Sequence, residues 1–307
     1  MFDAVIVGGG PAGLSAGLVL GRQKRNVLLV DGRSPRNRFA SEMHMYLGRD
    51  GSPPADLLAH GRAELDKYGV KQVADTVTAA SGQAGDFALT LADQGIVHTR
   101  AVLLATGVVD RPWDIPGLQE RWGASVFHCP FCHGHENDGR TIAVLGNREE
   151  AAIGAYLADR YSSDVVVCTH GPADLPEAVA GMLAAREVKV VETEVARIDG
   201  LLDDLILTFT DGTQLQRQAI FHAAPTEPST ELAAQLGCAR YDDGGVQVDE
   251  FQRTTVPGVF AAGDIARQPA VEKAATLVSV GAGAGVEAAV WLEQELFAAS
   301  FNAASGS

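Results

Sequence analysis

The feature of this chain that most constrains its fold is a buried strand that runs directly into a glycine-rich turn. The apolar run 2–7 is followed by Gly8-Gly9-Gly10-Pro11-Ala12-Gly13 and then by a stretch, 14–20, suited to a helix. The spacing G-x-G-x-x-G between a strand and a helix is typical of a dinucleotide-binding βαβ unit. Gly8 would make the tight turn, Gly10 would let the backbone approach a pyrophosphate, and Gly13 would let the helix pack on the strand.

Three other predicted strands end in residues suited to the same cofactor. One ends in Asp31, placed to accept a hydrogen bond from a ribose hydroxyl, and another ends in Thr106-Gly107, where the backbone again comes close to a dinucleotide. A third ends in Gly263-Asp264, and such an Asp can bond a ribityl hydroxyl of a flavin, while the helix after it points its N-terminus at the ring. We therefore predict that these residues share one nucleotide site.

Length, charge and apolar content exclude several classes of protein. The chain has 307 residues, 46% of them hydrophobic, which suits two domains of ordinary size. A net charge of −15 argues against nucleic acid or an anionic membrane as partner. Because the first strand begins at residue 2 and no run of eighteen apolar residues occurs, we expect no leader peptide, no membrane span and a cytoplasmic protein.

A linker marks the first domain boundary. Residues 111–117 contain two prolines, and a second strand–turn–helix–strand pattern covers 141–168 before the chain returns to the first domain at about Gly244. We also expect strands at 73–77 and 87–91, and a long Ala/Gly-rich helix at 274–296. The predicted fold is α/β, with two Rossmann-like three-layer domains, one discontinuous (1–115 and 244–307) and one smaller and inserted (116–243).

The inserted domain begins with a dithiol surrounded by titratable side chains. Cys129 and Cys132 form C-x-x-C, which in a reducing cytosol is more often catalytic or metal-binding than structural. A free thiol of pKa about 8.5 is only a few per cent thiolate at neutral pH, so thiol chemistry needs an acid and base nearby. We assign that role first to His133 and second to His128, with Glu136 as the group that orients an imidazole. A zinc site is the alternative, but it would want a second ligand pair elsewhere, and we expect no metal.

These motifs, in this order and spacing, resemble the low-molecular-weight thioredoxin reductases over nearly the whole chain. The resemblance rests on G-G-G-P-A-G at the start, A-T-G at 105–107, the C-x-x-C pair and P-G-V-F-A-A-G-D at 257–264. It implies a homodimer whose protomers each have a discontinuous FAD domain and an inserted NADPH-type domain that carries the dithiol. The residues expected to bind FAD are Gly8, Gly10, Pro11, Ala12, Gly13, Asp31, Gly32, Arg38, Thr106, Gly107, Gly263 and Asp264.

The second glycine turn departs from that family pattern. It has Gly146-Asn147-Arg148-Glu149-Glu150-Ala151, so long charged side chains stand where the backbone must approach a pyrophosphate. Two acids at a helix N-terminus satisfy the dipole but repel phosphate, and 168–174 holds no arginine to grip a 2′-phosphate. We expect that NADPH is not bound; a variant fingerprint that still binds it is the alternative.

The dithiol motif departs as well, because His133 stands where thioredoxin reductases have Asp. The string C-P-x-C-H-G-x-E resembles the FAD-dependent dithiol oxidases that close disulfides in natural products such as gliotoxin and holomycin. This implies oxidation of a small dithiol with O2 as acceptor and H2O2 as product, Cys129 being attacked by substrate and Cys132 donating to the flavin. The alternatives are a thioredoxin-disulfide reductase fed by NADPH or ferredoxin, and a flavin-binding redox sensor without turnover.

Overall fold

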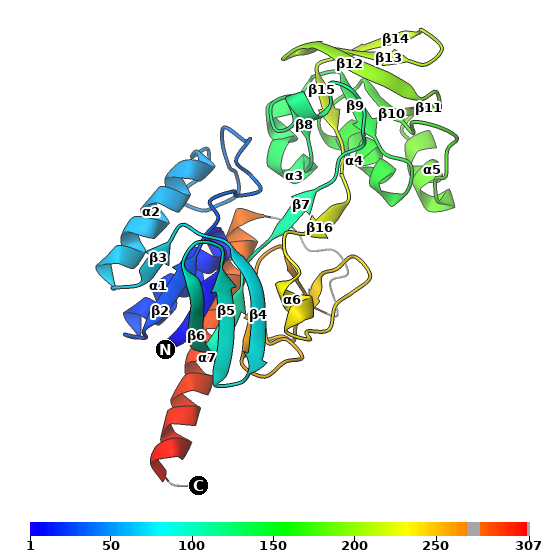
Figure 1. Ribbon diagram of the computed structural model, residues 1–307. Helices are drawn as coiled ribbons and strands as arrows, with labels where there is room; N and C mark the ends of the chain where they lie inside the picture. The colour runs from blue at the N-terminus through cyan, green and yellow to red at the C-terminus, as the bar shows by residue number, and fades with distance from the viewer. Residues whose placement is uncertain (269–276, 306–307) are drawn as a thin grey trace. The chain divides into compact units, whose positions relative to one another are not determined.

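The computed structural model describes residues 1–268 and 277–305, and it divides into two compact units (Figure 1). Unit 1 comprises Met1–Arg38, Glu42–Val109 and Thr226–Ser307, and unit 2 comprises Phe39–Ser41 and Asp110–Pro225. The chain thus crosses between units at 109/110 and 225/226, earlier at both points than the expected 115/116 and 243/244. The chain therefore rejoins unit 1 at Thr226, before the expected return at Gly244.

Unit 1 is built on a seven-stranded sheet in the order β3-β2-β1-β6-β5-β4, with β18 also pairing with β6. Its long strand β6 (Gly95–Leu104) pairs in parallel with β1 (Phe2–Val7) along one edge. The other edge of β6 is shared, because residues 95–99 pair antiparallel with β5 and residues 102–104 pair in parallel with β18. The remaining bounds are β2 Val27–Val30, β3 Lys71–Val73, β4 Val77–Gln83, β5 Asp86–Leu91 and β18 Val259–Ala261.

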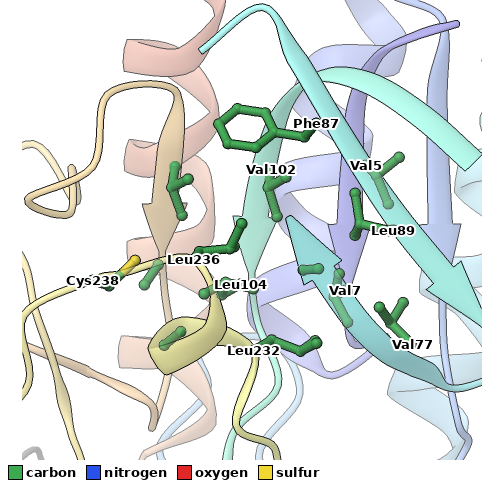
Figure 2. Close-up of a cluster of buried hydrophobic side chains, with 14 of the residues drawn as sticks. Val5, Val7, Val77, Phe87, Leu89, Val102, Leu104, Leu232, Leu236 and Cys238 are labelled. Atoms are coloured by element: carbon green, nitrogen blue, oxygen red, sulfur yellow. The ribbon is translucent and has the colours of Figure 1, made fainter. Parts of the chain in front are cut away.

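Side chains alternate between the two faces of this sheet, and each face has its own core. Ala4 and Ile6 of β1 pack with helices α1 (Pro11–Arg22), α2 (Pro54–Lys67) and α7 (Val278–Ser305). The opposite face, drawn in Figure 2, packs Val5 and Val7 against β4, β5 and the segment around α6 (Leu232–Gln235). The start of the expected helix 274–296 lies partly outside the described residues, and the helix runs past its expected end.

The second core explains why the chain returns to unit 1 before Gly244. Leu232, Leu236 and Cys238 are buried in it, in the same cluster as Phe87 of β5 (Figure 2). The backbone N–H of Ala80 in β4 also donates to the Gln235 side chain at 2.8 Å. These apolar contacts place the segment after Thr226 firmly in unit 1.

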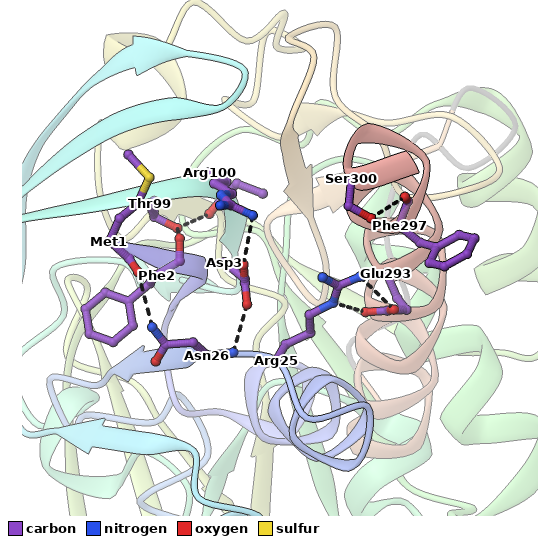
Figure 3. A network of polar contacts seen from close by, with 11 residues as sticks. Met1, Phe2, Asp3, Arg25, Asn26, Thr99, Arg100, Glu293, Phe297 and Ser300 are labelled. Atoms are coloured by element: carbon purple, nitrogen blue, oxygen red, sulfur yellow. Dashed lines mark hydrogen bonds and ion pairs between the residues drawn. The ribbon is translucent and has the colours of Figure 1, made fainter. Parts of the chain in front are cut away.

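A polar network ties the ends of unit 1 together (Figure 3). Arg25, just after α1, donates through Nε and Nη2 to both carboxylate oxygens of Glu293 in α7, at 2.6 and 2.9 Å. The hydrogen bond to Glu293 raises the pKa of the Arg25 guanidinium. Asp3 accepts from the Asn26 backbone at 3.0 Å and lies 3.4 Å from Arg100. A bidentate guanidinium–carboxylate pair fixes orientation as well as distance, so it sets how α7 lies along α1.

Unit 2 has a parallel sheet in the order β11-β10-β9-β15-β8. Its strands are β8 Val126–Phe127, β9 Ile142–Leu145, β10 Val165–Cys168, β11 Lys189–Val191 and β15 Ala219–Phe221. Helices α4 (Ala152–Arg160) and α5 (Glu177–Ala184) pack on one face, and a three-stranded antiparallel sheet covers the other. That sheet consists of β12 Val195–Leu201, β13 Asp204–Phe209 and β14 Gln214–Arg217. Both units are therefore three-layer α/β structures of the kind expected.

Candidate functional site: a nucleotide cradle and a dithiol

The glycine turn of unit 1 has the close contacts that its spacing predicts. Gly8 has φ +108°, and a Cβ built on it would lie 2.2 Å from the Ala105 carbonyl oxygen. A Cβ on Gly13 would lie 1.9 Å from the carbonyl oxygen of Gly8, so only glycine lets α1 start this close to the strand. A Cβ on Gly10 would meet no atom within 4 Å. The backbone at Gly10 is therefore open on the side where a pyrophosphate would bind.

The middle glycine of the triplet has a role that the sequence did not reveal. A Cβ on Gly9 would lie 2.3 Å from Oδ2 of Asp31, so the carboxylate rests against the backbone of the turn. The other oxygen of Asp31 accepts a hydrogen bond from the Arg33 backbone at 3.0 Å. The G-G-G run was the available signal, because G-x-G-x-x-G allows any residue at the position of Gly9. Asp31 is thus held next to the phosphate turn, where a ribose would lie.

The other two expected cofactor segments reach the same edge of the sheet, because parallel strands end together. Gly107 (φ +66°) follows β6, and Gly263 (φ +79°) follows β18, where a Cβ would lie 3.1 Å from the Cβ of Ala12. Asp264 forms an ion pair with Arg36 at 3.0 Å, and Thr106 accepts a hydrogen bond from the Ser229 hydroxyl at 2.6 Å.

Several of the expected residues hold this edge only indirectly. Pro11 stands in the first turn of α1, where its fixed φ suits helix initiation. Gly32 is exposed beside Asp31. Arg38 is exposed too, and its Nη1 donates to the Pro35 carbonyl at 3.1 Å, whereas the arginine that reaches Asp264 is Arg36. Sequence spacing alone did not distinguish these two arginines.

The dithiol lies at the start of a short helix in unit 2, α3 (Pro130–His133), directly after β8. Cys129 caps this helix, since its Sγ accepts from the Cys132 backbone N–H at 3.3 Å. The two sulfur atoms lie 2.7 Å apart. Gly134 permits the turn that follows, because a Cβ there would lie 2.4 Å from the Pro130 carbonyl oxygen. The two thiols are therefore held side by side at the start of α3.

Two histidines flank the dithiol in different surroundings. The His133 ring stacks on Phe127 of β8, with centroids 4.5 Å apart and planes at 22°. His128 has its Nδ1 3.9 Å from a carboxylate oxygen of Asp110, and that carboxylate is only 11% exposed. The contact places a carboxylate from another segment beside the ring of His128. Asp110, at the end of β7 (Val108–Asp110), was not among the residues that the sequence singled out; its position just after the A-T-G turn was the only signal.

The residues after the dithiol lie further out. His135 and Glu136 form an exposed 3-10 turn, His135–Asn137. Buried Asn137 anchors that turn by donating to the His133 carbonyl at 2.7 Å. The negative charge of Glu136 contributes to raising the pKa of Tyr161, after burial and a hydrogen bond to Tyr156. Asp110 is thus a carboxylate beside His128, and the charge of Glu136 also acts on Tyr161.

The second glycine turn is filled by its own side chains. Glu150 folds back so that its Oε1 accepts from the Asn147 backbone N–H at 3.4 Å, and its Cγ would be 2.9 Å from a Cβ on Gly146. Asn147 in turn donates to the Pro172 carbonyl and accepts from the Asp174 backbone, at 3.0 and 2.7 Å. The segment that would grip a 2′-phosphate is thus tied to the turn, and its Asp174 carboxylate forms an exposed ion pair with Arg148 at 2.9 Å.

A ring stack occupies the carboxyl edge of the same sheet. His222, which follows β15, accepts from the Trp113 backbone N–H at 3.2 Å and donates through Nδ1 to the Leu145 carbonyl of β9 at 2.9 Å. The Trp113 ring lies 4.8 Å from the ring of His222 and stacks at 5.3 Å on His170, which follows β10. Burial lowers the pKa of His222. Dinucleotides bind at this edge in such folds, and here indole and imidazole rings fill it.

The remaining cysteines are structural. Cys168 and Cys238 are both buried, and burial raises the pKa of the Cys168 thiol to about 12 and that of Cys238 in the same direction. Within 1–268 and 277–305, no group of three metal-ligating side chains lies together, and no helix is long and apolar enough to cross a membrane.

Comparison with known proteins decides the family. The model of the pyridine nucleotide-disulphide oxidoreductases matches residues 2–282, which include both units. The chain belongs to this family. Similar proteins include thioredoxin reductase tcpT of Claviceps purpurea, 34% identical over 85% of this chain and 86% of its own, and thioredoxin reductase sirT of Leptosphaeria maculans, 31% identical over 93% of each. A solved structure named HlmI is 35% identical, covers 100% of this chain and 98% of its own, and has a TM-score of 0.89.

Family membership makes this chain an oxidoreductase and a thioredoxin-reductase-like flavoprotein. It also implies FAD binding. We call the glycine turn of unit 1, with Asp31 and Asp264, the cradle. The cradle fits FAD, because the backbone at Gly10 is open, the carboxylate of Asp31 lies beside it, and Asp264 lies on the neighbouring loop. Thioredoxin reductase of Listeria monocytogenes is 25% identical over 96% of this chain. The fold and cofactor are those of the family, whereas the pyridine nucleotide turn departs from its pattern.

Proposed function

We propose that the protein is an FAD-dependent dithiol oxidase that forms a disulfide in a small natural-product dithiol, with O2 as acceptor and H2O2 as product. The proposal is supported by the second glycine turn, where Glu150 folds back on the Asn147 backbone and Asn147 donates to the Pro172 carbonyl, an arrangement that we expect to leave no room for NADPH. Electrons then have to enter from thiols, and the adjacent sulfurs of Cys129 and Cys132 are the group able to take them. The resemblance of C-P-x-C-H-G-x-E to gliotoxin- and holomycin-type oxidases also supports electron transfer from a substrate dithiol to the flavin.

We propose the roles of the two sulfurs from their places in the family motif. A substrate thiolate attacks Cys129 Sγ of the enzyme disulfide, Cys132 leaves as thiolate, and a mixed disulfide forms. The second substrate thiolate attacks the substrate sulfur of that bond, which releases the cyclic disulfide and leaves both enzyme thiols reduced. FAD, when bound, supplies the two-electron acceptor that returns Cys129 and Cys132 to the disulfide and passes the electrons to O2. The sum is one dithiol and one O2 giving one disulfide and one H2O2.

Two protons leave the substrate, and a base has to take them. His128, with a carboxylate oxygen of Asp110 at 3.9 Å, directly precedes Cys129 and is one candidate. His133 follows Cys132 directly and is fixed by its stack on Phe127. We propose that the base is one of these two histidines, and the contact with Asp110 makes His128 the first to test.

Five residues of the cradle would hold FAD. Gly8 and Gly13 would shape the turn, Gly10 would face the pyrophosphate, and Asp31 would accept from the ribose, with Asp264 near the ribityl chain once its ion pair with Arg36 opens. We also propose a homodimer, which sedimentation of the purified protein tests, and a cytoplasmic location, which fractionation of the source cells tests.

The test is oxygen uptake by the purified yellow protein with dithiothreitol, together with peroxide measured by a peroxidase-coupled dye. We expect one H2O2 per dithiol oxidised, and a large loss of rate in His128→Gln with a smaller loss in Asp110→Asn. The exposed His135→Gln is the matched control and should turn over normally. Oxygen uptake that is absent with every dithiol would refute the oxidase.

A second candidate is a disulfide reductase, because the curated relatives bear the name thioredoxin reductase. It requires NADPH or another donor to reduce the flavin, and NADPH-dependent reduction of a thioredoxin disulfide measures it. A redox sensor, the third alternative, would bind FAD and turn over neither substrate.

A further inference from the structure

An exposed phenylalanine stands between the two reactive cysteines. Phe131 follows Pro130 in α3, and 62% of it is exposed. Its ring lies 5.5 Å from that of Tyr156 in α4, and the Tyr156 ring lies 6.2 Å from that of Tyr161 at 64°. We call Phe131, Tyr156 and Tyr161 the aromatic shelf. All three belong to unit 2: Phe131 lies in α3 with Cys132, Tyr156 in α4, and Tyr161 directly after α4.

The inner end of the shelf is part of the fold. A Cβ on Gly134 would lie 2.6 Å from the Tyr161 ring, so this tyrosine packs against the end of α3. Burial and a hydrogen bond to Tyr156 raise the pKa of Tyr161, and that hydrogen bond joins the two tyrosines. Tyr156 is thus held as a backing for Phe131, whose other face is left to solvent.

The shelf suits a ring more than a charge or a protein. Aromatic faces attract other rings in offset or tilted arrangements, and Glu136 adds negative charge at the edge, which disfavours anionic thiols. A stable protein interface needs about 800 Å² from each partner, and one exposed phenyl ring with two half-buried tyrosines offers far less. A single flat ring system on a small molecule matches its size.

We infer that the aromatic shelf is a recognition site for a ring on the substrate, so that the enzyme takes a neutral or cationic dithiol bearing a flat ring. The ring lies on Phe131, backed by Tyr156, while the thiols reach Cys129 one residue before Pro130. This inference rests on the proposed function, because it assumes that a small dithiol is the electron donor.

The test compares two uncharged dithiols, 1,2-benzenedimethanethiol with a ring and dithiothreitol without one. Phe131→Ala should raise KM for the ring-bearing dithiol at least about tenfold and change KM for dithiothreitol by less than about threefold. Phe131→Trp should restore the ring preference. Phe297→Ala is the matched control, because Phe297 is equally exposed, at 64%, but lies on α7 in unit 1.

Two results would overturn the inference. An equal loss with both dithiols would mean that Phe131 only shapes the C-x-x-C turn, and a loss confined to reduction of a thioredoxin disulfide would mean that the shelf docks a protein. Binding without turnover separates this inference from the function: in Cys129→Ser, calorimetry should show 1,2-benzenedimethanethiol binding that Phe131→Ala abolishes. If the wild type oxidises no dithiol but this binding persists, the oxidase fails and the ring site stands; if the binding is absent, the ring site fails.

Discussion

Replacing Gly285 with Ala tests how closely α7 must approach the nucleotide turn. A Cβ on Gly285 would lie 2.0 Å from the carbonyl oxygen of Ala12, inside the glycine fingerprint. Ordinary contact needs about 3.2 Å, so α7 and the start of α1 must separate by about 1 Å, and such overpacking costs about 1–3 kcal/mol. Gly283, two residues earlier in the same helix, is exposed and has no atom within 4 Å of its Cβ position. Ala there should stabilise by about 0.5–1 kcal/mol through helix propensity.

Urea unfolding and the flavin content of each purified variant measure the two effects. We expect Gly285→Ala to unfold at lower urea than wild type and to lose part of its 450 nm absorbance, because the displaced Ala12 belongs to the phosphate turn. Gly283→Ala should unfold at slightly higher urea and stay fully yellow. Equal stability and equal flavin content in the two variants would refute the packing argument.

Three further predictions concern the dithiol and the two units. Cys132→Ser should keep FAD, seen as an unchanged flavin spectrum, and lose dithiol turnover; substantial turnover would eliminate the proposed conduit. Burial lowers the pKa of His222, so the unfolded chain binds the proton more readily; its stability is full above about pH 6.5 and is lost as pH falls toward the lowered value. His222→Gln should flatten the fall of the urea midpoint below that pH, and an unchanged slope would assign the dependence elsewhere. Glu293→Gln should cost about 1 kcal/mol, less at high salt, since it breaks a partly exposed pair with Arg25.

The fold was predictable where local rules and tertiary structure agree. The fingerprint from Gly8 to Gly13, the two α/β units and the carboxyl-edge cradle all follow from strand–turn–helix patterns with tight glycines. The expected strand 73–77 was wrong, because β3 ends at Val73 and β4 begins at Val77, with a break at 74–76. The return to unit 1 was placed late, since burial of Leu232 and Leu236 depends on a sheet face assembled from distant strands.

The candidate site was predictable in its members but not in its pairings. The C-x-x-C motif and both histidines were visible, yet the partner of His128 is Asp110, eighteen residues earlier and joined to it only by the fold. In the same way, Arg36 pairs with Asp264, and this pairing depends on the conformation of the loop after Asp31. The Trp113 stack over His222 was not foreseen at all, since its rings come from three separate segments.

The measurement that tests the account most directly is the flavin absorbance of the purified protein under anaerobic conditions. Excess NADPH should leave the band unchanged, because Glu150 and Asn147 fill the turn where the nucleotide would bind, and a small dithiol should then bleach it through Cys129 and Cys132. Rapid bleaching by NADPH would contradict the account, and the thioredoxin-disulfide reductase would take its place.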